Sequence, residues 1–174
     1  MQVNKQYLFP TVFYEVKDVL PKDTFDSVRQ HIVESYKIIK MGKFIFDDLK
    51  FVYDDFEITE MWANVTRKGE NHKVHTHQNN IYSGVIYLES GSSIRFLDPR
   101  PAANVLSPEM KEYNSENSNI CGFPSTENTM LLFPSWLQHY VPKNVGSERR
   151  TSISFNLMLR GMVGRKGSLQ SAKF

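Results

Sequence analysis

The chain has very little cysteine. Cys121 is the only one among 174 residues, so it cannot form an intrachain disulfide, a cysteine-based zinc ribbon or a redox pair. The sequence places no base beside it, and ordinary thiol behaviour is expected. No basic segment followed by a long apolar run occurs near residue 1, and no stretch approaches the ~20 apolar residues of a membrane span. The sequence therefore predicts a soluble, cytoplasmic protein.

An excess of charge of one sign is also absent. There are 21 Lys and Arg against 19 Asp and Glu, a formal charge of +2, so bulk charge gives no support for a nucleic-acid partner and does not exclude an acidic small substrate. The Gly-x-Ser-x-Gly elbow, the Walker loop and the Gly-x-Gly-x-x-Gly turn are missing. No motif therefore supports a hydrolase, NTPase or dinucleotide-binding function. Nothing indicates an oligomeric state.

What is present from residue 58 onward is a series of short apolar runs separated by Gly, Pro, Asn and Ser. The runs are ITEMWANVTR, SGVIYLES, SSIRFLDP, NTMLLFPS and RTSISFNLML. They predict an antiparallel sandwich or barrel, with hairpin turns at KGEN (68–71) and ESGSS (89–93). The length allows one sizeable core and not two, so residues 1–174 are expected to form a single domain.

Within that domain, residues 1–57 are expected to be mainly helical, residues 58–160 to form the β core and residues 161–174 to be a loosely held basic tail. A helix is predicted over 21–36, because apolar residues recur there at spacings of three and four. Those residues are Phe25, Val28, Ile32 and Tyr36. A second helical or loop segment is expected over 46–56. The long segment 99–126 is expected to be a flexible insertion or a lid.

Three of the five histidines lie in the stretch NHKVHTHQNN, at positions 72, 75 and 77. Residues two apart on a strand point to the same face, so His75 and His77 can present their imidazoles side by side. His72 cannot join them without a bend. Far downstream, His139 supplies a third candidate ligand. Three protein ligands leave positions open for substrate or dioxygen, as catalytic non-haem iron requires.

These residues also carry a family resemblance. The run H-x-H, SGVIYL, F-x-DPR, LLFPSWLQH-x-V-P and RRTSISFN, between Trp62 and Asn156, resembles the small 2-oxoglutarate- and Fe(II)-dependent oxygenases related to the prolyl hydroxylases. The resemblance implies a double-stranded β-helix (a cupin-like jelly roll) with an N-terminal helix packed against it. It also implies a dioxygenase that uses Fe(II), 2-oxoglutarate and dioxygen to hydroxylate an unidentified substrate, for which a peptidyl or free amino acid is the expectation.

By the same resemblance, His75 and His139 correspond to the first and last metal ligands. Arg150 corresponds to the basic residue that grips the far carboxylate of 2-oxoglutarate, and Ser152 completes an Arg-x-Ser pattern. A guanidinium fork can take a carboxylate bidentately, and a neighbouring hydroxyl can add one hydrogen bond. Tyr87 matches a strand position from which a tyrosine hydroxyl reaches this carboxylate; ordinary packing in the core is the equal alternative.

Other residues are weaker candidates for the same site. Asn64 shares a strand face with Trp62 and is a candidate for the keto-acid end of the co-substrate, although a plain structural role is favoured. Ser83 is weaker still. Arg149 is expected to point away from Arg150, as a surface charge.

The chain departs from the family at one position. Most of these enzymes have Asp or Glu two residues after the first histidine, whereas this chain has His77. Three neutral imidazoles remove one negative charge from the metal, which should weaken Fe(II) binding. Glu70 and Asp98 lack the spacing to replace it, and Asn79 would be a poor oxygen ligand.

Aromatic walls should shield such a centre, and four aromatic residues lie close to the proposed ligands in sequence: Tyr82, Phe96, Phe133 and Trp136. Arg100 and Trp136 are the residues expected to face a substrate. Two alternative functions stay open. One is a three-histidine cupin-like metalloprotein that does not use 2-oxoglutarate, and the other is a jelly-roll binding or structural module without enzymatic activity.

Overall fold

The computed structural model describes residues 2–9, 11–18, 35–100, 106, 108–114, 116–146 and 149–174. These residues contain one helix and twelve strands. In chain order they are β1 (Gln2–Leu8), β2 (Thr11–Lys17), α2 (Ser35–Asp48), β3 (Asp55–Thr66), β4 (His72–His75), β5 (Tyr82–Tyr87), β6 (Gly91–Leu97), β7 (Ile120–Ser125), β8 (Thr129–Pro134), β9 (His139–Val141), β10 (Arg150–Arg160), β11 (Met162–Val163) and β12 (Ala172–Lys173). The predicted mainly β class is confirmed.

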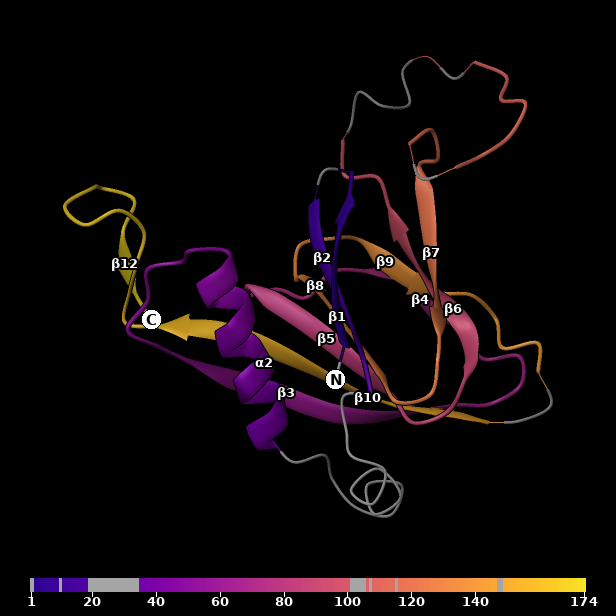
Figure 1. Ribbon diagram of the computed structural model, residues 1–174, viewed down its shortest axis with the longest axis horizontal. Coiled ribbons are helices and arrows are strands. Elements are labelled where there is room, and N and C mark those ends of the chain that lie inside the picture. Colours follow the sequence, from indigo (N-terminus) through magenta and orange to yellow (C-terminus); the bar gives the residue numbers. More distant parts are fainter. Residues whose placement is uncertain are drawn as a thin grey trace.

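Ten of the strands form two antiparallel sheets that pack face to face, as Figure 1 shows. The larger sheet has the order β1-β2-β8-β5-β10-β3 and the smaller sheet the order β4-β9-β6-β7. Strands β3 and β5 lie in the larger sheet, whereas the strands that follow them, β4 and β6, lie in the smaller one. The turns at 68–71 and 89–93 therefore cross between sheets, and their assignment as hairpin turns is wrong. Such crossing connections produce the expected jelly roll.

Two hydrophobic cores lie on opposite faces of the larger sheet. One fills the space between the sheets and includes Phe13, Tyr87, Phe96 and Phe133. The other lies between the larger sheet and helix α2. Because both faces of this sheet are covered, every residue of β5 and of β8 is buried. The expected packing of an N-terminal helix against the β core is confirmed.

The N-terminal part differs from the helical segment expected over 1–57. Strands β1 and β2 pair as antiparallel neighbours, and pairing of β2 with β8 extends the larger sheet. The helix predicted over 21–36 lies outside the described residues except for Ser35 and Tyr36, which begin α2. Helix α2 exists because four buried side chains recur on one face: Ile38, Met41, Ile45 and Phe46. Of the segment 46–56, the first three residues end this helix and the last two begin β3.

The two remaining expectations concern the tail and the long insertion. The tail folds back as the short pair β11–β12, and backbone hydrogen bonds of 3.0 Å join Gly161 and Phe174 in both directions. The segment 99–126 is described in part, and its last residues form β7 at the edge of the smaller sheet. No helix in the described part of the chain is long and apolar enough to cross a membrane.

Candidate metal centre

The smaller sheet brings two of the three predicted histidines together. Strands β4 and β9 are antiparallel neighbours, and His75 lies directly opposite His139 in their register. His77 follows the end of β4, where its backbone N–H donates a 2.9 Å hydrogen bond to the carbonyl oxygen of Ser135. One ligand atom from each of His75, His77 and His139 lies within 4.8 Å of the others. Two nitrogens bound to one metal at about 2.0–2.1 Å can be at most about 4.2 Å apart, so small side-chain rotations suffice to close the site.

Two of the imidazoles are held in the tautomer that metal binding needs. The Nδ1 of His75 lies 2.7 Å from the carbonyl oxygen of Lys73, and the Nδ1 of His139 lies 2.9 Å from that of Leu137. A carbonyl oxygen only accepts, so each Nδ1 must carry the proton and donate it. Each Nε2 then keeps its lone pair for a metal, which is the usual way in which outer partners orient a histidine ligand.

Burial favours the neutral form of two of the three imidazoles. Burial lowers the pKa of His139 to about 3, and burial also lowers the pKa of His77. The rings of Phe133 and Phe96 lie 4.8 and 5.8 Å from the ring of His139, centroid to centroid. These two aromatic residues form the wall predicted for the site.

The other two predicted wall residues lie elsewhere. Tyr82 is buried in the core on the far side of the larger sheet, where its ring contacts Phe46. Trp136 is 54% exposed. The aromatic shield of the centre is therefore narrower than expected, because β5 and the residues after β8 direct these two side chains away from it.

No carboxylate joins the three histidines within the described residues. Glu70 accepts the backbone N–H of Arg67. Asp98 is held by the guanidinium of Arg100, whose side chain is 53% exposed, and the expectation that Arg100 faces a substrate stays a prediction. Asn79 lies in a turn with φ of 59°. The candidate donor set in the described residues is thus the three imidazoles.

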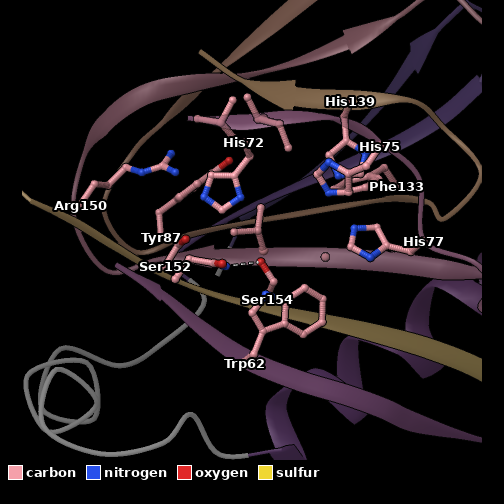
Figure 2. Close-up of a pocket in the computed structure, with 15 residues that line it drawn as sticks. Trp62, His72, His75, His77, Tyr87, Phe133, His139, Arg150, Ser152 and Ser154 are labelled. Carbon is pink, nitrogen blue, oxygen red and sulfur yellow. Dashed lines mark hydrogen bonds between the residues drawn. The ribbon is translucent and has the colours of Figure 1, made fainter. Parts of the chain in front are cut away.

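A cavity of about 100 Å³ extends from the histidines between the two sheets. One water needs about 10–15 Å³ by this measure, so there is room for a small molecule. The three histidines lie at one end and Arg150 at the other, with His72, Tyr87 and Ser152 between them (Figure 2). A bidentate ligand on the metal could therefore extend toward Arg150.

The far end of the cavity has the groups that a carboxylate needs. Arg150 is buried, and its Nη1 donates a 2.9 Å hydrogen bond to the carbonyl oxygen of Ser92. Its guanidinium carbon lies 5.7 Å from the centre of the Tyr87 ring. The Tyr87 hydroxyl is the one buried side-chain polar atom without a hydrogen-bond partner in the described part of the chain. Burial raises the pKa of Tyr87, so the phenol stays neutral and can donate.

An orphaned buried hydroxyl beside a buried guanidinium is costly unless a ligand satisfies both groups. Gly91 makes room for Arg150, since a Cβ atom at position 91 would lie 3.0 Å from Arg150 Cδ. The residues present therefore fit a dicarboxylate co-substrate such as 2-oxoglutarate, with its distal carboxylate at this end.

Of the remaining predicted residues, some line the cavity and others lie outside it. Ser152 is buried on β10, pairs across the sheet with Tyr87 and lines the cavity. Asn64 also lines it and donates a 2.9 Å hydrogen bond to the Ser154 hydroxyl. Ser83 bonds Asn156 instead and is not among the lining residues. Arg149 is exposed, as expected.

Sequence reasoning missed one histidine of the cavity. His72 was expected to join His75 and His77 only through a bend in the strand, and β4 has such an irregularity, since it carries one more residue than β9 between His72 and His75. This β-bulge turns His72 to the same side, where it lines the cavity. An isolated strand pattern has no means of revealing a bulge that is defined by the register with a distant strand.

The fold is shared with several solved structures. A prolyl-4-hydroxylase from Pseudomonas putida matches 86% of this chain and 88% of its own length, with 14% identity and a TM-score of 0.61. HygX from Streptomyces hygroscopicus, with nickel and 2-oxoglutarate bound, matches 94% of this chain and 91% of its own, with 11% identity and a TM-score of 0.59. The viral collagen prolyl hydroxylase of Paramecium Bursaria Chlorella virus-1 matches 83% and 94%, with 10% identity and a TM-score of 0.55.

At such identities these likenesses establish the fold alone, and no curated protein matches the chain. The fold is a jelly roll with a cluster of three imidazoles and a buried arginine lining one cavity. The family model described as "Putative 2OG-Fe(II) oxygenase" matches residues 60–156, more than half of the chain, and the protein belongs to this family. It is thus an enzyme, an oxygenase whose cofactor is Fe(II) and whose co-substrate is 2-oxoglutarate.

Proposed function

We propose that His75, His77 and His139 hold the iron through one ring nitrogen each, and that Arg150 holds the distal carboxylate of 2-oxoglutarate. The observation that carries this assignment is the arrangement of the cavity. Its metal-binding nitrogens lie at one end, and a buried guanidinium lies at the other. Ser152 and Tyr87 would add hydroxyl donors to the same carboxylate, and Asn64 would line the path of the chain between them.

Iron bound with 2-oxoglutarate supplies the oxidising chemistry, in which dioxygen converts the oxo-acid to succinate and carbon dioxide and hydroxylates a substrate. The protein orients and shields this chemistry. His75 and His139 present lone pairs because their Nδ1 protons are already donated to carbonyl oxygens. The rings of Phe133 and Phe96 exclude water from one side of the centre.

The substrate class and the cellular setting are part of the proposal. A peptidyl or free amino acid is the proposed substrate, supported by the fold shared with prolyl hydroxylases. The cytoplasm is the proposed location, since one cysteine without a disulfide partner in the chain suits a reducing compartment. We also propose that residues 1–174 act as a single oxygenase domain.

Anaerobic titration of Fe(II), with and without 2-oxoglutarate, tests the proposed centre. A weak visible charge-transfer band that requires both ligands is expected. Iron binding without this band would favour a three-histidine metalloprotein that does not use 2-oxoglutarate. Absence of any stoichiometric first-row metal would favour a binding or structural module.

Variants assign the ligands. His139→Ala should abolish iron binding, whereas His72→Ala, which changes a cavity histidine outside the cluster, should retain it. His77→Asp restores the commoner ligand set and should bind Fe(II) more tightly, because it returns a negative charge to the metal. Normal iron binding by His139→Ala, or loss of iron in His77→Asp, would contradict the proposed ligand set.

A further inference from the structure

A row of polar side chains crosses the inner face of the larger sheet beside the metal centre. The strand register places Glu60 on β3 opposite Asn156 on β10, and Asn156 opposite Ser83 on β5. Asn156 Nδ2 donates a 3.0 Å hydrogen bond to Glu60 Oε2, and the Ser83 hydroxyl donates a 2.7 Å bond to Asn156 Oδ1. The Ser83 and Ser135 hydroxyls lie 2.8 Å apart.

This row fixes one exposed carboxylate. Asn156, Ser83 and Ser135 are each at most 1% exposed, whereas Glu60 is exposed. A satisfied buried network is rigid, so the Glu60 carboxylate at its end is oriented in advance. The backbone carbonyl oxygen of Ser135 accepts the backbone N–H of His77. Ser135 therefore contacts the Glu60 network through its hydroxyl and the backbone of a proposed metal ligand through its carbonyl oxygen.

Glu60 lies at a shallow, open surface depression that we call the mouth groove, lined by Glu60, Met61, Trp62 and His77. Trp62 and His77 also line the inner cavity, so the groove and the cavity share a wall. The ring of Trp62 lies 5.7 Å from that of His77, centroid to centroid. A molecule in the mouth groove would thus contact His77 and lie beside the candidate metal centre.

The lining of the mouth groove has the chemistry that recognises a cation. In the described part of the chain Glu60 forms no salt bridge, whereas Glu57 on the same strand pairs with Arg160. A carboxylate attracts an ammonium or guanidinium group, and the face of an indole attracts the same cations. The indole of Trp62 also offers apolar surface for an aliphatic stem, whereas the Met61 side chain packs toward the core beneath helix α2. An anionic substrate would be repelled by Glu60.

We propose that the mouth groove selects a substrate that carries an ammonium or guanidinium group on an aliphatic stem, with Glu60 as its charge partner and Trp62 as its aromatic wall. The inference rests on the proposed function, because it names the substrate class of the same metal centre. Glu60 is thereby a specificity-determining residue and not a metal ligand.

The test uses a matched pair of small ligands. Nα-acetyl-L-lysine methylamide and Nα-acetyl-L-norleucine methylamide have the same carbon side chain and differ in the terminal ammonium group. Their dissociation constants are measured by calorimetry on the full chain loaded with Fe(II) and 2-oxoglutarate under anaerobic conditions. The lysine ligand should bind at least about tenfold more tightly, which corresponds to about 1.4 kcal/mol.

Two variants test whether the preference for the lysine ligand depends on Glu60. Glu60→Gln removes the charge but keeps an acceptor oxygen for Asn156, and it should reduce the lysine preference to within about twofold. Glu57→Gln, a neighbouring carboxylate outside the groove, should keep the full preference. Equal affinity for the two ligands, no binding of either, or an undiminished preference in Glu60→Gln would overturn the inference.

The same titrations separate this inference from the proposed function. Binding of 2-oxoglutarate to the iron-loaded wild type is measured first, and its absence would overturn the proposed function itself. If 2-oxoglutarate binds and the lysine preference is absent, only the cation-selective groove is wrong. If Glu60→Gln loses iron, the Glu60 carboxylate is needed for iron binding, and its assignment to substrate recognition is overturned.

Discussion

Replacing Arg150 with glutamine should weaken 2-oxoglutarate binding strongly while leaving the iron in place. Arg150 is buried at the end of the cavity away from the three histidines. Removing one partner of a buried, hydrogen-bonded charge pair costs about 2–5 kcal/mol. The lower part of this range applies, because glutamine still donates one hydrogen bond and Tyr87 is unchanged. A loss of about 2–3 kcal/mol corresponds to about 30- to 150-fold weaker binding.

The assay is an anaerobic titration of the iron-loaded protein with 2-oxoglutarate, followed by the charge-transfer band. Arg149→Gln is the matched control, since Arg149 is exposed and adjacent in sequence, and its affinity should equal that of the wild type. The reasoning is refuted if Arg150→Gln binds 2-oxoglutarate within about twofold of the wild type. It is also refuted if the variant fails to bind iron although it remains folded.

Three further predictions concern packing, the orphaned hydroxyl and acid stability. Gly84→Ala should lower the free energy of unfolding in urea by about 1–3 kcal/mol, because its Cβ would lie 2.3 Å from the Phe155 ring; an unchanged value would contradict this. Tyr87→Phe should weaken 2-oxoglutarate binding by about 1 kcal/mol, without destabilising the ligand-free protein, because the hydroxyl has no protein partner to lose. The hydrogen bond from Lys5 lowers the pKa of Asp48, so its stabilisation is present above the unfolded pKa of about 3.8 and is lost as the pH falls through the folded value. The difference in unfolding free energy between wild type and Asp48→Asn should therefore shrink in acid, and a constant difference would argue against the ion pair.

The strands of the β core were predictable because each is a short apolar run bounded by turn-forming residues. The five runs between Ile58 and Leu159 correspond to β3, β5, β6, β8 and β10. The turns at 68–71 and 89–93 were located correctly, but they do not join neighbouring strands of one sheet. A turn sequence does not specify which sheet the next strand enters. The N-terminal hairpin was missed for a similar reason, since β2 is fixed by pairing with the distant β8.

The three histidines proposed to hold the metal were predictable from spacing and from family resemblance, and the structure brings them together. The position of His72 was not, because it depends on a bulge in the pairing of β4 with β9. Glu60 was not found either. Its environment arises from cross-strand register with Asn156 and Ser83, which are distant in the sequence.

The most direct test of the metal centre is a crystal structure of the protein grown anaerobically with Fe(II) and 2-oxoglutarate, with anomalous data collected at the iron edge. A single iron peak should lie about 2 Å from one ring nitrogen of each of His75, His77 and His139, with the far carboxylate of 2-oxoglutarate against the guanidinium of Arg150. An iron bound by a carboxylate in place of one of these imidazoles, or an oxo-acid that lies away from Arg150, would contradict the account.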